Sequence, residues 1–274
     1  MPSRTGWKNR TAVVSGGSSG LGLSIARALG ECGAHVILIG RDLVRLKQAE
    51  EQVLSAGSPS VTAVPLDVTC EDDRWQSLKA ALSIQGCDLL INAVGKSDRG
   101  LIQQLGRTDL LQQLEVNVLA SHATTRFCWE ALLESKGCVV NISSLAGIIP
   151  GPCMGGYSMS KHALVGWHRQ WKLESAESGV HFLLVSPGPI ARQDNTDRYA
   201  DLVASRGLDE LVNKPGGGVS LRRIDPEELS CRILDAAASR THELVVPGKA
   251  RFLAALYQLW PSFAEGIVRR KMKQ

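Results

Sequence analysis

The chain lacks several features that would fix its class at once. Its seven cysteines form no Cys-x-x-Cys pair and are odd in number, so we expect neither a disulfide framework nor a metal site. No run approaches the roughly 18 apolar residues of a membrane span. Aromatic residues make up only 5% of the chain and lie in no basic stripe, which argues against a nucleic-acid partner.

Neither sign of charge dominates. The 31 Lys and Arg against 27 Asp and Glu leave a net charge of +4, which excludes a supercharged scaffold and a polyanionic tail. With 44% hydrophobic residues, a chain of 274 residues can bury a large core unaided. The polar start, residues 1–10, does not resemble a targeting peptide. We therefore expect a cytoplasmic protein.

Short apolar runs rich in β-branched residues alternate with segments of helical period, which predicts a parallel sheet covered on both faces. We expect strands at residues 11–15, 35–39, 61–65, 89–92, 138–142, 182–186 and 244–246. We expect helices at residues 20–31, 42–55, 71–83, 107–134, 155–177 and 226–238. No linker divides them, so residues 1–250 are predicted to form one domain, with a mobile flap near residues 191–223.

A glycine-rich turn follows the first expected strand and opens a helix. Gly16, Gly20 and Gly22 are spaced as Gly-x-x-x-Gly-x-Gly. Glycines let the backbone turn sharply and approach a pyrophosphate, whose charge then meets the free N–H groups of the helix. The pattern favours a dinucleotide site, and the alternative is a tight turn without a ligand.

The residues after the second strand point to the cofactor. Arg41 stands where the adenosine ribose would lie, and a guanidinium suits a 2′-phosphate, so we predict NADP(H). The alternatives are NAD(H), with Asp42 on the ribose, or a solvated Arg. Asp67 and Val68, after the third strand, could border the adenine, although Asp67 is also a plausible N-cap for the next helix.

Tyr157 and Lys161 are four residues apart and share one face of a predicted helix. A phenol with a pKa of about 10 is a poor base at neutral pH, but a fixed cation beside it lowers that pKa. Thirteen residues upstream, Ser144 follows a strand and could project at the carboxyl edge of the sheet, where such sheets bind ligands. Ser143 is the competing serine.

These features together resemble the short-chain dehydrogenase/reductase family. The matching motifs are Ser15-Gly-Gly-Ser-Ser-Gly-Leu-Gly22, Asp67, Ile91-Asn-Ala-Val-Gly95, Asn117, Asn141-Ile-Ser-Ser144, Tyr157-x-x-x-Lys161 and Ser186-Pro-Gly-Pro-Ile190. The resemblance covers residues 10 to about 190 closely. It implies a doubly wound Rossmann fold of seven parallel strands, and homodimers or homotetramers formed through the helices expected at 107–134 and 155–177.

The resemblance also implies roles for single residues. Tyr157 would be the acid/base, Ser144 would hold the substrate oxygen, Lys161 would activate Tyr157 and bind the nicotinamide ribose, and Asn117 would anchor a proton-relaying water. The expected cofactor contacts are Gly16, Ser18, Ser19, Gly20, Leu21, Gly22, Arg41, Asp67, Val68, Asn92, Ala93, Gly95, Tyr157, Lys161, Pro187, Gly188 and Ile190.

Three positions depart from the family pattern. Ser15 replaces the usual Thr, and Ala93 replaces a second Asn that commonly braces the central strands. Arg192 stands where a Thr often meets the cofactor, and Thr196 is a substitute if the loop bulges. Arg192 itself is either a contact to an anionic group or a solvated flap residue.

The leading hypothesis is an NADP(H)-dependent oxidoreductase acting on a small-molecule carbonyl or secondary alcohol. The main alternative is a non-catalytic NADP(H)-binding sensor or scaffold, and the third is an epimerase or dehydratase. The set of Asn117, Ser144, Tyr157 and Lys161 favours the enzyme, because a sensor has no need of an activated phenol.

Residues 251–274 form a candidate amphipathic extension. Apolar residues recur there at spacings of three and four among several Lys and Arg, and Pro261 should divide the segment into two helices. The alternatives are contact with a membrane surface, a lid over a lipophilic pocket, or packing on the domain or a subunit partner.

Overall fold

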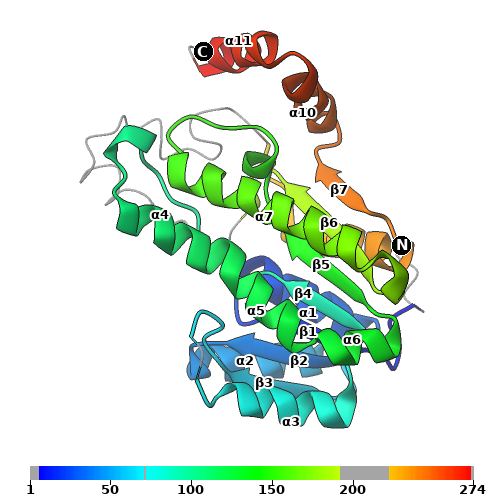
Figure 1. Cartoon of the computed structure of the whole chain (residues 1–274). Coiled ribbons are helices and arrows are strands. Elements are labelled where there is room, and N and C mark those ends of the chain that lie inside the picture. The colour runs from blue at the N-terminus through cyan, green and yellow to red at the C-terminus, as the bar shows by residue number, and fades with distance from the viewer. Residues whose placement is uncertain (1–5, 71, 192–221, 273–274) are drawn as a thin grey trace.

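The computed structural model describes residues 6–70, 72–191 and 222–272, and all seven strands lie in one parallel sheet (Figure 1). The strands are β1 Thr11–Ser15, β2 His35–Gly40, β3 Val61–Pro65, β4 Leu89–Asn92, β5 Cys138–Ile142, β6 His181–Pro187 and β7 Glu243–Val246. Their spatial order is β3-β2-β1-β4-β5-β6-β7. The order reverses between β1 and β4, and the crevice at the carboxyl ends of these strands is where such sheets bind ligands.

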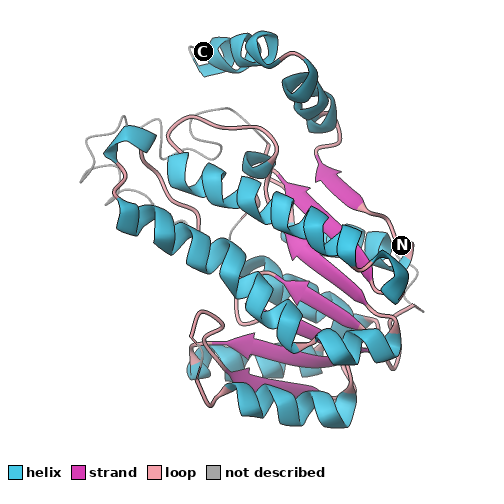
Figure 2. Cartoon of the chain, viewed as in Figure 1, coloured by secondary structure: helices cyan, strands magenta, loops and turns pink. Residues whose placement is uncertain are grey.

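Helices cover both faces of this sheet (Figure 2). They are α1 Gly20–Glu31, α2 Leu43–Ser55, α3 Trp75–Gln85, α4 Arg107–Leu114, α5 Ala120–Phe127, α6 Trp129–Ser135, α7 Gly155–Glu174 and α9 Pro226–Ala238, followed by α10 Ala250–Leu259 and α11 Pro261–Met272. Apolar residues of α1, α2 and α9 pack on one face, and those of α3, α5 and α6 pack on the other. Because both faces are buried, the central strands are apolar except at their ends.

The architecture is the doubly wound α/β fold expected from the sequence, and each strand begins and ends within one residue of its expected bounds. Two helices differ. The helix expected at 71–83 begins only at Trp75, because Asp72 accepts hydrogen bonds from the backbone N–H and guanidinium of Arg74 in a turn before it. The helix expected at 107–134 is divided into α4, a π-helical turn at Glu115–Leu119, α5 and α6.

The chain ends in two helices separated at Pro261, as the sequence predicts, and the first begins at Ala250 rather than at residue 251. In the part of the chain that the structure describes, no helix is both long and apolar enough to cross a bilayer. The expected flap near 191–223, with Arg192 and Thr196, falls almost entirely outside the described residues.

Candidate functional site

The glycine turn between β1 and α1 depends on the absence of side chains. Gly16 has φ of +77°, and Gly20 has φ of +54°, both in the left-handed region that favours glycine. A Cβ on Gly22 would lie 2.2 Å from the carbonyl oxygen of Gly16, so no larger residue could close the turn in this form. A Cβ on Gly20 would meet no atom within 4 Å, so this side of the turn is open.

The start of α1 can receive an anion. The Ser19 side chain makes no capping hydrogen bond to a described residue, and the first turn carries no acidic residue. Its N–H groups and the positive end of the helix dipole therefore remain available to a pyrophosphate. Ser18 lies against the end of β2, where a Cβ on Gly40 would be 2.8 Å from the Ser18 Oγ. Leu21 instead packs against the core.

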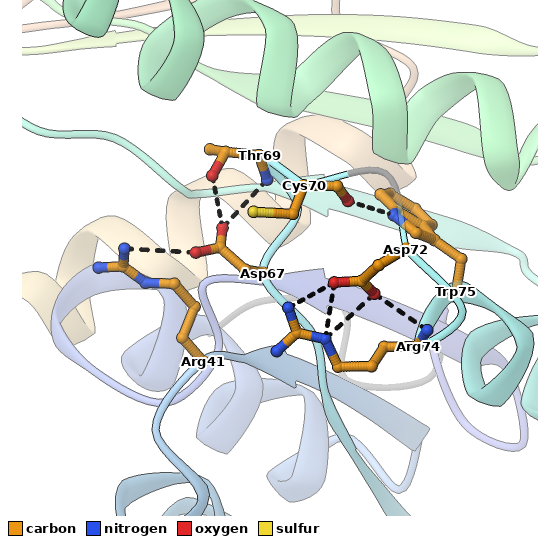
Figure 3. Close-up of polar contacts among 7 residues, drawn as sticks. All are labelled: Arg41, Asp67, Thr69, Cys70, Asp72, Arg74 and Trp75. Carbon is orange, nitrogen blue, oxygen red and sulfur yellow. Dashed lines mark hydrogen bonds and ion pairs between the residues drawn. The ribbon is translucent and has the colours of Figure 1, made fainter.

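Figure 3 shows the polar residues beyond the ends of β2 and β3. An Arg41 guanidinium nitrogen lies 3.5 Å from a carboxylate oxygen of Asp67, and the Arg41 side chain is 75% exposed. Thr69 donates two hydrogen bonds to Asp67, from its backbone N–H at 3.0 Å and its hydroxyl at 2.7 Å. Burial acts to raise the pKa of Asp67, but these hydrogen bonds and Arg41 outweigh it, so the pKa lies below its ordinary value. Asp67 is therefore an anion that pairs loosely with Arg41, and it does not cap a helix.

Two other residues near the expected ribose and adenine positions have structural roles. Asp42 caps α2, and one of its carboxylate oxygens accepts from the backbone N–H groups of Val44 and Arg45 at 3.0 and 3.1 Å. The Val68 side chain is buried in the core, so its backbone is the part of this residue that could border the adenine.

The end of β4 lies against the glycine turn. The backbone N–H of Ala93 donates to the Ser15 carbonyl at 3.0 Å, and a Cβ on Gly16 would lie 3.0 Å from the backbone nitrogen of Val94. A Cβ on Gly95 would lie 2.9 Å from Asn117 Oδ1 and 3.4 Å from Lys161 Nζ. Glycine at 95 therefore allows the cofactor-side turn to approach the predicted catalytic residues closely.

Asn92 does not face the crevice with its side chain. Its buried amide donates to Thr125 Oγ1 at 2.9 Å and to Asn141 Oδ1 at 2.8 Å, and the Asn141 amide in turn contacts His168 Nδ1 at 2.9 Å. This network joins β4, β5, α5 and α7 inside the molecule. The expectation that Asn92 flanks the cofactor is therefore restricted to its backbone.

Asn117 lies in the π-helical turn, and its side chain explains why the long helix is interrupted. Its amide oxygen accepts from the Lys96 N–H at 3.0 Å, and its amide nitrogen contacts the Lys96 carbonyl and Ser160 Oγ, each at 3.0 Å. Asn117 is fully buried. It thus ties the loop after β4 to α7, and π-turns of this kind recur at functional sites.

Ser144 caps the short 3₁₀ turn after β5. Its Oγ accepts from the Ala146 N–H at 3.1 Å, which leaves the hydroxyl proton free to be donated. Ser143 differs from it, because its hydroxyl is buried and has no hydrogen-bond partner among the described residues. The half-buried Ser144, and not Ser143, is therefore the serine that a ligand could reach.

The 3₁₀ turn is held tightly on α7. The Ser158 hydroxyl donates to the Ala146 carbonyl at 2.8 Å. A Cβ on Gly147 would lie 2.7 Å from the Lys161 carbonyl oxygen. These contacts fix Ser144 relative to the half-buried Tyr157 and to Lys161, both of which α7 carries.

Lys161 is almost completely buried, although its amine is a charged group in water. Its Nζ donates to the Ile142 carbonyl at 2.9 Å, and burial lowers its pKa to about 8. The amine is thus still largely protonated at neutral pH. Burying an ammonium beside the end of β5 lowers the stability of the fold. Buried ionisable groups of this kind are concentrated at functional sites.

The segment after β6 borders the same crevice. Gly188 follows Pro187, and its N–H donates to the Val246 carbonyl at 2.7 Å. A Cβ on Gly188 would approach the Leu145 side chain to 3.5 Å, beside Ser144. Ile190 forms an isolated bridge with Ile224. The structure therefore brings Gly188, one of the expected nicotinamide-side residues, close to the turn that follows Ser144.

Sequence reasoning missed the residues that hold the site through backbone atoms. Lys96 contributes its N–H and carbonyl, and Ile142 its carbonyl, and no side-chain pattern signals such roles. It also missed two buried charged residues in the loop after β4, Asp98 and Arg99. Among the described residues, no group of three or more His, Cys, Asp and Glu gathers as metal ligands would.

The family model described as short chain dehydrogenase matches residues 10–202. The chain is 28% identical to the NADPH-dependent 3-dehydrocapnine reductase of Ornithobacterium rhinotracheale, over 97% of this chain and 98% of that protein. It is 30% identical to dehydrogenase/reductase SDR family member 7 of Mus musculus, over 92% and 74%.

Solved structures share the fold. The L-sorbose reductase of Gluconobacter frateurii, determined with NADPH and L-sorbose, superposes with a TM-score of 0.76 and 21% identity, covering 89% of this chain and 97% of that one. An NAD⁺-bound xylitol dehydrogenase superposes with a TM-score of 0.77 and 21% identity, covering 88% and 98%.

Proposed function

The chain belongs to the short-chain dehydrogenase/reductase family of nicotinamide-dependent oxidoreductases, and from this premise we propose that it interconverts a carbonyl and a secondary alcohol with NADP(H), using Tyr157 as the acid/base. The observation that carries the proposal is the buried Lys161 ammonium one helical turn from Tyr157, beside Asn117 and Gly95. A non-catalytic sensor would gain nothing from a desolvated cation at this place.

The residues divide the chemistry among them. The bound cofactor supplies or accepts the hydride. Ser144 donates a hydrogen bond from its hydroxyl to the substrate oxygen, where negative charge develops during reduction, and keeps its proton. Tyr157 delivers the proton that completes the alcohol, and in oxidation it removes that proton. Lys161 stabilises the phenolate form electrostatically, and its remaining N–H groups are free to hold the nicotinamide ribose.

The glycine turn and the N-terminus of α1 fit the pyrophosphate, because they offer N–H groups with little side-chain bulk. Two observations favour NADP(H) over NAD(H). Arg41 is mostly exposed and only loosely paired with Asp67, so it can turn to a 2′-phosphate. Asp42, the residue that would bind the ribose of NAD(H), is engaged in capping α2.

Asn117 would anchor a water that passes protons to bulk solvent. Its side chain is already committed to Lys96 and Ser160, so any such water would contact the backbone of the π-helical turn. The substrate is proposed to be a small carbonyl or alcohol of lipophilic character. We also propose a cytoplasmic homodimer or homotetramer.

The test is the substitution Tyr157→Phe, with Tyr257→Phe on α10 as the matched control. NADPH absorbance would be followed with a panel of ketones, steroids and acyl-linked carbonyls. We expect Tyr157→Phe to lose turnover at least about 100-fold while its NADPH affinity stays within about threefold. The Tyr257→Phe control should match the wild type.

Retained turnover in Tyr157→Phe would remove Tyr157 as the acid/base. Tight NADPH binding by the wild type, without turnover of any carbonyl in the panel, would favour the sensor or scaffold.

A further inference from the structure

The last two helices, α10 and α11, stand apart from the layers that cover the sheet (Figure 1). The main contacts of α10 are with α11 and with β7, the strand that precedes it. Between the two helices, Ala264 is completely buried. The pair is called here the C-terminal hairpin, residues 249–272.

The C-terminal hairpin turns its largest apolar side chains to solvent. Phe252 is 79% exposed, Leu259 68%, Trp260 63% and Phe263 65%. The other five tryptophans of the chain are buried or half-buried. A helix normally buries such residues, and a cluster of exposed large apolar side chains in one segment marks an interaction surface.

Charge identifies the chemistry of that partner. From residue 249 to the end, the chain has six Lys and Arg against Glu265 alone, a net charge of +5. The whole chain has only +4, so the preceding 248 residues carry a slight negative charge. The excess positive charge of the protein is therefore concentrated in its last 26 residues, the same segment that carries the exposed aromatic residues.

We infer that the C-terminal hairpin binds the surface of an anionic lipid bilayer. Aromatic and long apolar side chains enter the boundary between headgroups and acyl chains, while Lys and Arg meet the acidic headgroups. The hairpin lies on the surface and does not cross it. The ten residues of α10 and the twelve of α11 reach about 15 and 18 Å, well short of the roughly 30 Å hydrocarbon core.

The same charge argues against the other occupants of this face. A second copy of the chain would bring a second net charge of +5 against the first, and the two hairpins would repel each other. The preceding 248 residues have a net charge of only −1, which gives little attraction to hold the hairpin as a lid. An acidic lipid surface supplies both the apolar medium and the countercharge.

The experiment measures co-flotation of the full-length protein with vesicles of phosphatidylcholine alone or with about 30 mol% phosphatidylglycerol. We expect at least tenfold stronger partitioning into the anionic vesicles, and loss of that preference as salt rises to about 1 M. Trp260 emission should shift to shorter wavelength on binding.

Two pairs of substitutions separate the apolar from the charged contribution. Trp260→Glu with Phe263→Glu should weaken partitioning at least about tenfold. Lys249→Gln with Arg270→Gln should weaken it by a similar factor and flatten the salt dependence. Ile84→Glu is the control, because Ile84 is 83% exposed on α3, far along the chain from the hairpin. Thermal melting checks that each variant is folded.

Equal partitioning by Trp260→Glu/Phe263→Glu and the wild type would overturn the proposal. So would an absence of binding to anionic vesicles. If that absence came with a wild-type dimer that the double variant breaks, the face would be a contact between copies. If it came with a raised KM in the double variant, the hairpin would be a lid. The flotation results do not depend on the identity of the substrate, and only the KM comparison requires one.

Discussion

At the scale of single residues, two neighbouring serines illustrate how placement decides function. Ser143 and Ser144 are chemically the same and follow the same strand. One hydroxyl is sealed inside without a described partner, and the other accepts from Ala146 and keeps a proton to donate. Both serines are candidates for the catalytic serine by their position after the strand. Only the three-dimensional structure distinguishes the accessible hydroxyl from the buried one.

We expect Ser144→Ala to lower kcat about 100-fold, since it removes a donor to the developing oxyanion. Its loss of folding stability should stay near 1 kcal/mol, the cost of one cap. Ser143→Ala should keep its activity and be neutral or slightly stabilising, because it removes a buried hydroxyl with no described partner. Steady-state kinetics and urea unfolding of both variants test this. A larger kinetic defect in Ser143→Ala would reverse the assignment.

Arg41→Ala tests the cofactor preference. Loss of a charge-assisted contact to the 2′-phosphate should raise KM for NADPH about 10- to 100-fold and leave NADH nearly unaffected. Arg74→Ala is the matched control, because it removes the same charge from a neighbouring guanidinium already held by Asp72 at 2.9 Å (Figure 3). The measurement is the ratio of kcat/KM for the two cofactors. If Arg41→Ala and Arg74→Ala changed this ratio equally, the change would come from the loss of one positive charge in this region and not from a contact between Arg41 and the 2′-phosphate.

The residue scale also shows what sequence reasoning can reach. Lys161 and Arg41 could be identified from the sequence, because each is a charged residue at a motif position where its charge has a chemical use. The directions of the Val68 and Asn92 side chains could not be predicted, because a motif identifies a residue without saying which way its side chain points. Contributions of backbone atoms, such as the Ile142 carbonyl, leave no trace in residue type.

At the scale of elements, strands were predicted better than helices. Apolar runs of β-branched residues end sharply at polar residues or glycine, so their bounds are visible in the sequence. The helix expected at 107–134 keeps its apolar period across the π-helical turn, so periodicity does not reveal the interruption. The turn follows from hydrogen bonds between Asn117 and Lys96, which are distant in sequence.

The contact of the 3₁₀ turn with α7 predicts the effect of Gly147→Ala. The new Cβ would lie 2.7 Å from the Lys161 carbonyl oxygen, so the turn and the helix must move apart. We expect a loss of about 1 to 3 kcal/mol in unfolding free energy and a lower kcat, because Ser144 would shift relative to Tyr157. The control is Gly166→Ala. Gly166 lies on α7 with open space around its Cβ, so this variant should lose neither stability nor kcat. Urea unfolding and kinetics check this pair, and an unaffected kcat in Gly147→Ala would separate packing from catalysis.

At the scale of the whole molecule, one buried network links the sheet to the helix that carries the site. Asn92, Asn141 and His168 join β4, β5 and α7 through hydrogen bonds of 2.8 and 2.9 Å. His168 is buried, and burial, aided by nearby cations, lowers its pKa from 6.5 to about 3. It is therefore neutral in the folded protein, and its Nδ1 can accept from Asn141.

This neutral histidine predicts how stability depends on pH. Above pH 6.5 His168 is neutral in both the folded and unfolded states and has no effect. As the pH falls from 6.5 toward 3, only the unfolded chain binds the proton, so the free energy of unfolding decreases by up to about 1.4 kcal/mol per pH unit. Gln keeps an acceptor for Asn141 but does not titrate. The unfolding free energy of His168→Gln, measured by urea unfolding, should therefore fall less steeply than that of the wild type between pH 6.5 and about 5. His162→Gln, on the exposed side of α7, is the control and should follow the wild type. Parallel curves for all three proteins would mean that His168 is not held neutral, and the network would then not favour the neutral ring.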